Sequence, residues 1–411
     1  MNQRSTDRLK PVDRIFRALG HRTLRATGGI VPAAAPNGAE RWLVASEDGS
    51  GSPVSVDVHD PRFYRRLALE GTLGAGRSWI DGDWDCDDLP LLIRRVVARD
   101  GLRMGIDGVP AHVASLLRRL AAPLARNSRR GSRRNIAAHY DLGNELFERM
   151  LDPSMTYSSA VFPEPGASLE AAQFEKYDRI CRRLGLTAEH EVVEIGTGWG
   201  GFALHAAQVY GSHVTTTTLS REQHAYALDR IRKADCEDRI TLRLDDYRDL
   251  RGRFDRLVSI EMIEAVGASF LPGYFRTCSQ LLHPTGAMSL QAIVIGDQNY
   301  EAAAGHVDFV KEYIFPGGCL PSITRMAECA RDETDLRIHH IDDITADYAE
   351  TLRRWRDKLD AHEDEIRSLG YDDRFLRMWR FYLAYCEAGF EERHISCIQI
   401  DFVKPQWRPE P

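Results

Sequence analysis

The stretch EVVEIGTGWGG (residues 191–201) decides the fold, because an apolar strand runs directly into a cluster of glycines. The pattern predicts a strand over residues 191–195 and a helix that begins at Trp199. Glycine allows the backbone to turn sharply and to approach a ligand closely, so the turn predicts a ligand-binding loop. A glycine turn that holds no ligand is the less favoured alternative, since so many glycine and polar positions suit a strand-to-helix junction poorly.

Strands and helices alternate on the carboxyl-terminal side of this stretch. Further strands are predicted at residues 214–218, 240–246, 255–261 and 286–294, with a helix at residues 221–234. This order predicts an α/β fold, a Rossmann-like and mostly parallel sheet with helices on both faces and a site at the carboxyl ends of the strands. Two long helices, at roughly 345–369 and 373–392, precede a final strand, ISCIQIDFVK, which is expected at an edge of the sheet.

A boundary divides the chain into two predicted domains. Proline, glycine and serine interrupt the periodicity within residues 121–134, which predicts a linker. Residues 1–120 mix short strand-like runs with helical periodicity, so they are predicted to form a small α+β domain. Residues 135–411 carry the glycine loop and are predicted to form the larger, catalytic domain.

The composition is that of a globular chain. No run approaches the ~20 apolar residues that cross a bilayer, and the net charge of −7 argues against a nucleic-acid partner. The amino terminus lacks an apolar segment followed by a cleavage site, so a cytoplasmic protein is expected. The eight cysteines are scattered without a CxxC pair, which predicts reduced thiols and no structural metal.

One segment of the chain is strongly basic. No acidic residue lies between Asp107 and Asp141, whereas seven arginines lie from Arg118 to Arg134. Two interpretations remain open, a solvated linker and a patch that binds anionic lipid headgroups.

The glycine loop favours one cofactor over another. Gly196, Gly198 and Gly201 formally satisfy GxGxxG, so a dinucleotide site is an alternative. Glu194, an acid at the end of the first strand, is instead characteristic of methyltransferases. The second strand ends in Thr218 without the acid that would bind the ribose of NAD. We therefore expect S-adenosylmethionine. The predicted cofactor-binding residues of this region are Glu194, Gly196, Thr197, Gly198, Trp199, Gly200, Thr218, Leu219, Ser220, Gln223, Asp246 and Tyr247.

Several further segments resemble the family of cyclopropane-fatty-acid synthases and mycolic-acid methyltransferases, which have the class I methyltransferase fold. They are NIAAHYDLGNELFERMLDPSMTYSSAVF (135–162), TLSREQ (218–223), DYRDL (246–250), SIEMIEAVG (259–267), EYIFPGGCLPS (312–322) and DYAETLRRW (347–355). In that family, residues that match Tyr157 and Ser158 contact S-adenosylmethionine. The segment GTLGAGRSWIDGDWDCDDL (71–89) resembles an extra domain of bacterial phospholipid-acting members, which implies a lipid or membrane-interaction role for residues 1–120.

The resemblance implies a reaction. A methyl group passes from S-adenosylmethionine to the cis double bond of an unsaturated phospholipid acyl chain, and a cyclopropane fatty acid forms through a carbocation. Aromatic faces stabilise such a cation. The candidates for this role are Tyr157, Phe162, Tyr313, Phe315 and Tyr348. A base must then remove a proton. Its loss from the new methyl group closes the ring, whereas its loss from the neighbouring carbon leaves a methyl branch beside a double bond and no ring.

The resemblance also implies the base, a bound bicarbonate ion. The predicted catalytic residues that hold it are Ser159, Glu264, Gln291 and Tyr348, together with the backbone of Ile293. Two of them depart from the family pattern, because Ser159 replaces a cysteine and Gln291 replaces a histidine. Serine and glutamine still donate hydrogen bonds to an anion, but neither supplies the charge of a protonated histidine. We therefore expect weaker anion binding.

Other functions were weighed against this one. Methylene or methyl branching of an unsaturated lipid would use the same motifs. Methylation of a soluble small molecule is a further alternative, but the amino-terminal domain argues against it. A non-catalytic lipid-binding protein would leave the glycine loop without a ligand. An NAD-dependent protein would require an acid at the end of the second strand, which this sequence lacks. We further expect peripheral association with membranes that carry the substrate, and a homodimer.

Overall fold

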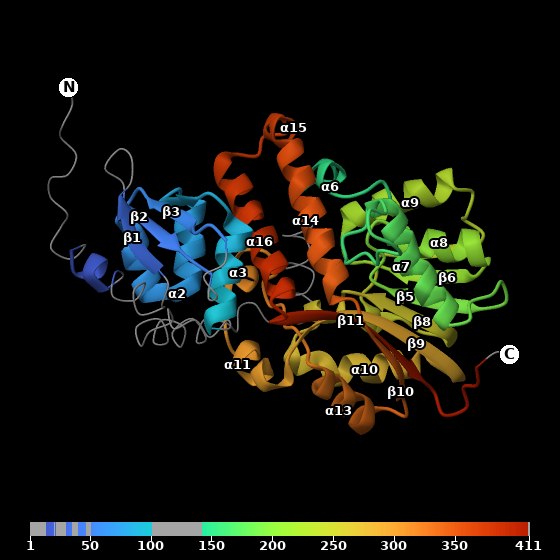
Figure 1. The fold of residues 1–411 in the computed structure, drawn as a ribbon. Coiled ribbons are helices and arrows are strands. Elements are labelled where there is room, and N and C mark those ends of the chain that lie inside the picture. Colours follow the sequence, from blue (N-terminus) through green and yellow to red (C-terminus); the bar gives the residue numbers. More distant parts are fainter. Residues whose placement is uncertain are drawn as a thin grey trace. The chain divides into compact units, whose positions relative to one another are not determined.

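The computed structural model divides into two compact units (Figure 1). The residues that the structure describes are 14–19, 21, 30–34, 40–46, 51–100 and 142–409. Unit 1 consists of residues 1–123, 306–312 and 370–394, and unit 2 consists of residues 124–305, 313–369 and 395–411. The predicted basic linker, 121–134, lies outside the described residues, as does the segment 135–141.

Unit 2 is built on a seven-stranded sheet. Its strands are β5 (Glu191–Ile195), β6 (His213–Thr217), β7 (Ile240–Arg243), β8 (Phe254–Ile260), β9 (Leu282–Ile295), β10 (Arg337–Asp343) and β11 (Ile395–Val403). The order across the sheet is β10-β11-β9-β8-β5-β6-β7, in which β11 runs antiparallel to both of its neighbours. The chain therefore proceeds from β5 toward one edge and then resumes at β8 on the other side of β5. Ligands bind at such a reversal in α/β sheets.

The prediction of a mostly parallel sheet is confirmed, but the predicted place of the last strand is wrong. β11 lies inside the sheet between β9 and β10, and residues 397–401 of β11 are buried. The edge is formed by β10, a strand that the sequence pattern did not predict. β10 is exposed along almost its whole length, so it lacks the apolar alternation by which a strand is recognised.

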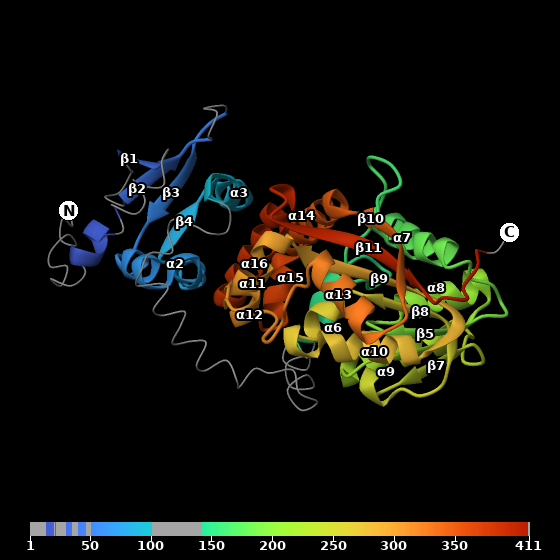
Figure 2. The ribbon, with the colours of Figure 1, turned by 90° about the horizontal axis from the view of Figure 1, so that it is seen from below.

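Helices cover both faces of this sheet, as predicted (Figure 2). Alternation along β5 explains the two cores, because Val192 packs against α7 and α8 whereas Val193 faces α10 and α13. The helices of unit 2 are α6 (Asn144–Met150), α7 (Leu169–Arg183), α8 (Gly201–Tyr210), α9 (Arg221–Lys233), α10 (Leu271–Gln280), α11 (Tyr300–Ala304), α13 (Ile323–Glu333), α14 (Thr345–Ala361) and α15 (Glu363–Ser368). α12 (Phe309–Tyr313) lies almost entirely within the segment 306–312, which belongs to unit 1. Short 3₁₀ turns lie at Tyr247–Asp249, Ile263–Ala265, Ala268–Phe270 and Asp297–Asn299.

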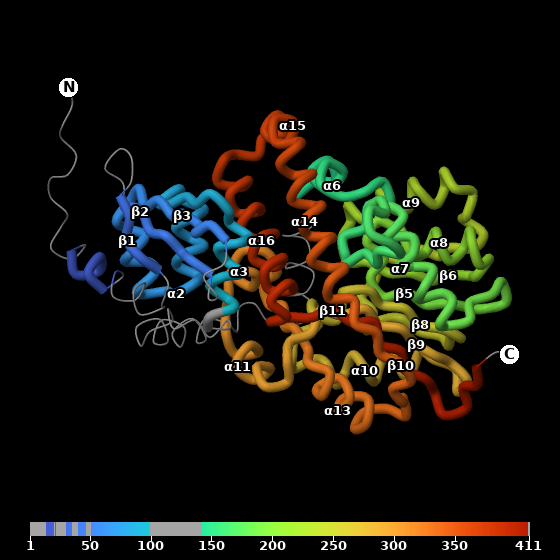
Figure 3. The backbone as a smooth tube through the Cα atoms, in the orientation of Figure 1, coloured from blue at the N-terminus to red at the C-terminus, as the bar shows by residue number. Residues whose placement is uncertain are grey.

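Unit 1 has the predicted α+β character. Its antiparallel sheet has the order β1-β2-β3-β4. The elements are β1 (Ile30–Ala34), β2 (Glu40–Val44), β3 (Val54–Val58), β4 (Trp84–Cys86), α2 (Arg62–Ile80), α3 (Leu89–Asp100) and α16 (Asp373–Glu391). α16 packs against α2 and α3, and the tube in Figure 3 shows this late, red segment beside the early, cyan α3. The catalytic domain predicted from the sequence, 135–411, includes residues 306–312 and 370–394. In the structure, the contacts of these two segments join them to unit 1.

Candidate active site

The glycine loop lies at the carboxyl end of β5 and leads into α8. Gly196, Gly198 and Gly200 have φ angles of 103°, 53° and 89°, a region that residues with a side chain rarely adopt. A Cβ atom on Gly201 would lie 2.5 Å from the hydroxyl oxygen of Tyr177, so no larger residue fits there. By contrast, a Cβ on Gly198 would meet no atom within 4 Å. The loop therefore borders open space that is compatible with a bound cofactor.

Glu194 is buried just before this loop. The hydroxyl of Thr216 donates a hydrogen bond of 2.5 Å to Oε2 of Glu194, and the hydroxyls of Thr216 and Thr197 lie 2.6 Å apart. Burial raises the pKa of Glu194 to about 8, and the hydrogen bond from Thr216 opposes that rise. The carboxyl group is thus held rigidly behind the loop, where a positively charged ligand would stabilise its ionised form.

Lys176 of α7 is a buried charge that the sequence interpretation missed. Its ammonium group donates a 2.6 Å hydrogen bond to the hydroxyl of Ser158 and lies 4.6 Å from the centre of the Tyr177 ring. Burial lowers the pKa of Lys176 to about 7, and the negative charge of Glu261 raises it again. The spacing of these residues in the sequence indicated this burial, because Gln173, Lys176 and Tyr177 share the helix face that points into the core. Lys176 and Gln173, whose amide donates to the carbonyl of Ser158, together fix the predicted cofactor residue Ser158.

The second predicted cofactor segment follows β6. Ser220 caps α9 by accepting a hydrogen bond of 3.2 Å from the backbone of Gln223. The hydroxyl of Thr218 donates to the side-chain oxygen of Gln223 at 2.9 Å. Leu219 lies between them and is partly exposed. Thr218, Ser220 and Gln223 therefore form one hydrogen-bonded turn beside the glycine loop, because β6 is the neighbour of β5.

The third segment, after β7, holds an ion pair that was not predicted. The carboxylate of Asp246 accepts hydrogen bonds of 2.7 and 2.6 Å from the guanidinium of Arg248 and also caps the 3₁₀ turn that follows. The ring of Tyr247 packs edge-on against Tyr274 with 5.4 Å between ring centres. Asp246 is thus already engaged by a cation on its own turn.

Two further predicted cofactor residues lie against aromatic side chains. Tyr157 lies between Phe147 and Trp355, with ring centres 5.4 and 5.1 Å away. Trp199 is buried, and its indole nitrogen donates a 2.7 Å hydrogen bond to the side-chain oxygen of Asn144. Trp199 therefore connects α6 to the glycine loop, whereas Tyr157 connects α6 to α14.

The predicted catalytic residues converge on Glu261, a residue that the sequence interpretation did not choose. Oε1 of Glu261 accepts hydrogen bonds of 2.8 Å from the backbone of Ser159 and 2.8 Å from the amide of Gln291. Oε2 accepts a 2.6 Å hydrogen bond from the hydroxyl of Tyr348. Three groups that the family resemblance assigned to a bound bicarbonate therefore hold a carboxylate of the chain itself.

The orientation of two donors follows from their neighbours. Ser159 uses its backbone, because its hydroxyl donates to the carbonyl of Ala160 at 2.9 Å. Gln399 donates a 2.9 Å hydrogen bond to the side-chain oxygen of Gln291, which turns the amide nitrogen of Gln291 toward Glu261. The cross-strand pairing of Gln291 with Gln399 on β9 and β11 makes this contact possible.

The backbone at Glu261 is unusual. Its φ angle is 48°, in the left-handed region that favours glycine. Residues in such conformations often lie at functional sites, where the surroundings hold them in place. Glu261 immediately follows β8, and this turn directs its side chain into the cluster of donors.

Glu264 has a different environment from Glu261. The resemblance implied that Glu264 and the backbone of Ile293 both hold a bicarbonate ion, whereas here Oε1 of Glu264 accepts a 2.5 Å hydrogen bond from the backbone of Ile293 itself. Oε2 of Glu264 is buried without a hydrogen-bond partner among the described residues. Burial, together with the nearby charge of Glu261, raises the pKa of Glu264 to about 8. Burial also raises the pKa of Glu261, whereas its hydrogen bonds from Tyr348 and Gln291 lower it. The donors around Glu261 therefore favour its ionised form, whereas Glu264, with one donor and a like charge nearby, is the carboxyl group whose neutral form is favoured.

The remaining aromatic candidates are not gathered around one point. Tyr348 lies edge-on to Trp355, which Tyr157 also contacts. Phe162 faces the guanidinium of Arg354 at 4.6 Å. Tyr313 and Phe315 lie in the segment that leads to Cys319, whose backbone donates to the carbonyl of Glu264. Within the described ranges, no cluster of three or more His, Cys, Asp or Glu side chains is arranged to hold a metal ion.

The strand order, the glycine loop and the acid before it define a class I S-adenosylmethionine-dependent methyltransferase. The family model for mycolic acid cyclopropane synthetase matches residues 127–400, and the chain belongs to this family.

Three comparisons illustrate the relationship. The chain is 38% identical over 355 residues to the cyclopropane-fatty-acyl-phospholipid synthase of Escherichia coli strain K12, which covers 85% of the chain and 88% of that relative. It is 36% identical over 405 residues to the tuberculostearic acid methyltransferase UfaA1 of Mycobacterium tuberculosis, covering 94% and 91%. The mycolic acid cyclopropane synthase CmaA1, solved with SAH and CTAB, superimposes with a TM-score of 0.62 and 28% identity over 66% of this chain and 98% of that chain. The protein is an S-adenosylmethionine-dependent methyltransferase whose homologues modify lipids.

Proposed function

We propose that this enzyme methylates the cis double bond of an unsaturated phospholipid acyl chain, and that the carboxylate of Glu261 accepts the proton released afterwards. The observation that carries this proposal is the convergence of three donors, from Ser159, Gln291 and Tyr348, on Glu261. The relatives named above act on lipids, which supports the choice of substrate.

The cofactor site is proposed from the geometry of the loops. Gly196, Gly198 and Gly200 would admit the cofactor close to the backbone. Ser158, which Lys176 of α7 holds in place, and Glu194 of β5 would face it. When bound, S-adenosylmethionine supplies an electrophilic methyl group on a positively charged sulfur. Glu194, buried and ionised with difficulty, is suited to balance that charge.

The base is proposed to be part of the chain. An alkene that has received a methyl group carries a positive charge and must lose a proton to become stable. Glu261 is held by hydrogen bonds and so is oriented before the reaction, which is how a general base is most effective. A protonated Glu264, which its raised pKa favours, would keep the charge of these two carboxyl groups at one negative unit. Bicarbonate, which the family resemblance implied, would then serve only if Glu261 were absent.

Two products are compatible with this chemistry. Loss of the proton from the transferred methyl group gives the cyclopropane ring, which we propose as the first candidate. A methylene branch is the second candidate. It would form if a hydride shift moved the positive charge onto the methyl-bearing carbon and the methyl group then lost its proton. Because Glu261 is tethered to the chain and held by Ser159 and Gln291, its fixed position would decide which of these routes is followed.

The test is a single reaction with product analysis. The full-length protein is incubated with vesicles of dioleoyl phosphatidylglycerol and methyl-labelled S-adenosylmethionine, and the product lipid is fragmented in a mass spectrometer. Label in the acyl chain supports the proposal, and the fragments distinguish ring from branch. Absence of label from the lipid, with the cofactor bound, would contradict it.

Membrane association is a separate proposal. Among the described residues, no helix has the length and apolarity needed to cross a bilayer. We propose that a cytoplasmic homodimer reaches the membrane surface through the basic stretch from Arg118 to Arg134, since arginines attract anionic headgroups. Co-sedimentation with phosphatidylglycerol vesicles should fall as salt is added, because salt screens the attraction. Co-sedimentation that is indifferent to salt would leave the linker interpretation, and light scattering would report the oligomeric state.

A further inference from the structure

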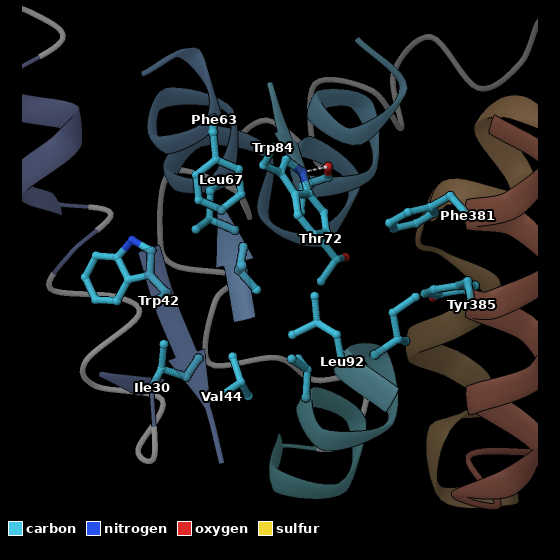
Figure 4. A pocket seen from close by; sticks show the side chains of 14 residues that line it. Ile30, Trp42, Val44, Phe63, Leu67, Thr72, Trp84, Leu92, Phe381 and Tyr385 are labelled. Atoms are coloured by element: carbon cyan, nitrogen blue, oxygen red, sulfur yellow. Dashed lines mark hydrogen bonds between the residues drawn. The ribbon is translucent and has the colours of Figure 1, made fainter. Parts of the chain in front are cut away.

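Unit 1 contains an apolar cavity of about 100 Å³ (Figure 4). It lies between the four-stranded sheet and three helices, α2, α3 and α16. Its lining comes from all of these elements, for example Val44 of β2, Leu67 of α2, Leu92 of α3 and Phe381 of α16. Each of these four side chains is buried, so the cavity is an internal feature of unit 1.

The two tryptophans of the lining present carbon to the cavity. The indole nitrogen of Trp84 donates to the carbonyl of Ala75 at 2.9 Å, and that of Trp42 donates to the hydroxyl of Tyr64 at 2.9 Å. Their polar groups are therefore satisfied within the protein. A buried water requires two to four polar partners, and the only hydroxyl groups of the lining, on Thr72 and Tyr385, lie on partly exposed residues, so the inner part of the cavity suits a hydrocarbon better than water.

The shape of the cavity depends on two glycines. Gly71 interrupts α2 with φ 59° and ψ −135°, and this kink redirects the helix so that Thr72 and Ala75 face the cavity. A Cβ atom on Gly76 would lie 2.6 Å from the ring of Phe309 and 3.0 Å from that of Phe381. The close approach at Gly76 positions the aromatic wall formed by α16. The path of the backbone at these two glycines therefore helps to form the cavity, which is not merely a gap beside a small side chain.

The opening lies between the helices. Thr72, Ala75, Val96 and Tyr385 are the lining residues that keep partial exposure, and they come from α2, α3 and α16. The residues from the sheet are buried. A ligand would therefore enter between the helices with its apolar end toward the sheet, and two hydroxyl-bearing side chains, Thr72 and Tyr385, would lie near its outer part.

We propose that this cavity binds the methyl-terminal end of a lipid acyl chain and gives unit 1 a hydrocarbon site of its own. Protein interiors rarely contain voids larger than a water molecule, and an engineered apolar cavity of roughly 150 Å³ stays dry and binds benzene. The present volume accordingly accommodates a few terminal carbons rather than a whole chain. The choice of a lipid among apolar ligands rests on the proposed function. Such a site would retain a lipid at unit 1 independently of its double bond.

The test uses the full-length protein and saturated lipid probes, which cannot be methylated. One arm uses vesicles of saturated phosphatidylglycerol that contain a phospholipid with a photoreactive diazirine near the methyl end of one chain. The other arm uses a free saturated fatty acid with the same group, so that the two arms distinguish a phospholipid chain from a free acid. After illumination, we expect adducts on unit 1 peptides that contain Thr72 and Ala75, Val96, or Phe381 and Tyr385.

The variant Ala75→Phe fills the cavity from the mouth, and Ala98→Phe is the matched control because Ala98 is exposed on α3. We expect a loss of unit 1 adducts of tenfold or more in Ala75→Phe and none in Ala98→Phe, with unchanged binding of S-adenosylhomocysteine by both. Val96→Phe provides a second filling variant should Ala75→Phe fold poorly. No unit 1 adduct in either arm, or equal labelling of the filled and control proteins, would overturn the proposal. Methyl transfer to unsaturated vesicles is measured separately, so its failure leaves this result intact.

Discussion

Replacement of Glu261 by glutamine gives the most direct test of the proposed base. Glutamine keeps the size of the side chain. Its one oxygen can still accept from Ser159 and Gln291 while its amide nitrogen donates to the hydroxyl oxygen of Tyr348, but it cannot take a proton from the substrate. General base catalysis contributes roughly 10²–10⁴ in rate, so kcat should fall by at least about 100-fold, equivalent to about 2.7 kcal/mol. Binding of S-adenosylhomocysteine should change little, since the residues of the glycine loop do not contact Glu261 in the hydrogen-bond network.

The variant Glu261→Gly extends this test. Glycine readily adopts the φ angle of 48° found at this position, so the backbone should be retained. Removal of the carboxylate leaves the donors of Ser159, Gln291 and Tyr348 without their acceptor. A small carboxylate anion, bicarbonate or formate, should then occupy the space and restore part of the activity, whereas Glu261→Gln should not respond because its amide fills that space.

The assay is transfer of labelled methyl groups to unsaturated phospholipid vesicles in buffer depleted of bicarbonate, with added anion as the variable. Glu189→Gln serves as the control, since Glu189 is exposed in unit 2. Full activity of Glu261→Gln in depleted buffer would refute the assignment of Glu261 as the base. Strong dependence of the wild-type enzyme on bicarbonate would refute the idea that the chain supplies its own carboxylate.

Further variants test the rest of the site. Glu264→Gln should impair turnover while sparing cofactor binding. It should also flatten the pH dependence of stability. The pKa of this carboxyl is about 8 in the folded protein against 4.5 as the ordinary value, so folding takes up a proton between those values and the wild-type free energy of unfolding falls as pH rises. In urea unfolding, the free energy of unfolding of the variant should decrease with pH less steeply than that of the wild type, by about 1 kcal/mol per pH unit. An identical slope in both proteins would contradict the burial of Glu264. Lys176→Met should lower the free energy of unfolding by roughly 3 kcal/mol, because it leaves buried carboxylates without their cation, and should weaken the hold on Ser158; unchanged stability and unchanged S-adenosylhomocysteine binding would show that Lys176 has neither role. Gly198→Ala should weaken S-adenosylhomocysteine binding at least roughly tenfold in calorimetry, about 1.4 kcal/mol, while Gly166→Ala, also at a positive φ with open space around it, should leave binding unchanged; equal effects of the two would mean that backbone strain alone is responsible.

The sequence pattern predicted the strands of the parallel sheet, because β5 and β8 contain short apolar runs and β6 is rich in β-branched threonine. It failed at β10 and β11 for opposite reasons. β10 is exposed and lacks an apolar face, whereas β11 is buried and its neighbours could not be deduced locally. The run ISCIQIDFVK is interrupted by Ser396, Gln399 and Asp401, an alternation typical of a strand with one solvent-exposed face, although Gln399 and Asp401 are in fact buried.

The active site was predicted in part. The donors Ser159, Gln291 and Tyr348 were chosen through their place in matching motifs, and the structure brings them to one point. The acceptor, Glu261, was missed because it stands three residues before the expected Glu264 in the same motif. No local pattern reveals that Ser159 and Glu261, 102 positions apart, are hydrogen-bonded. Lys176 was overlooked for a similar reason, because a lysine in a helix is ordinarily exposed.

The interleaving of the two units limits how the protein can be divided. The chain passes from one unit to the other after residues 123, 305, 312, 369 and 394. A fragment that ends at residue 123 would lack α16, and the apolar side chains of α2 and α3 that pack against it would meet water. Unit 1 is consequently not encoded as one continuous segment of the gene. Its transfer to another enzyme, or its deletion from this one, would require cuts on both sides of two insertions that lie within the sequence of the methyltransferase itself.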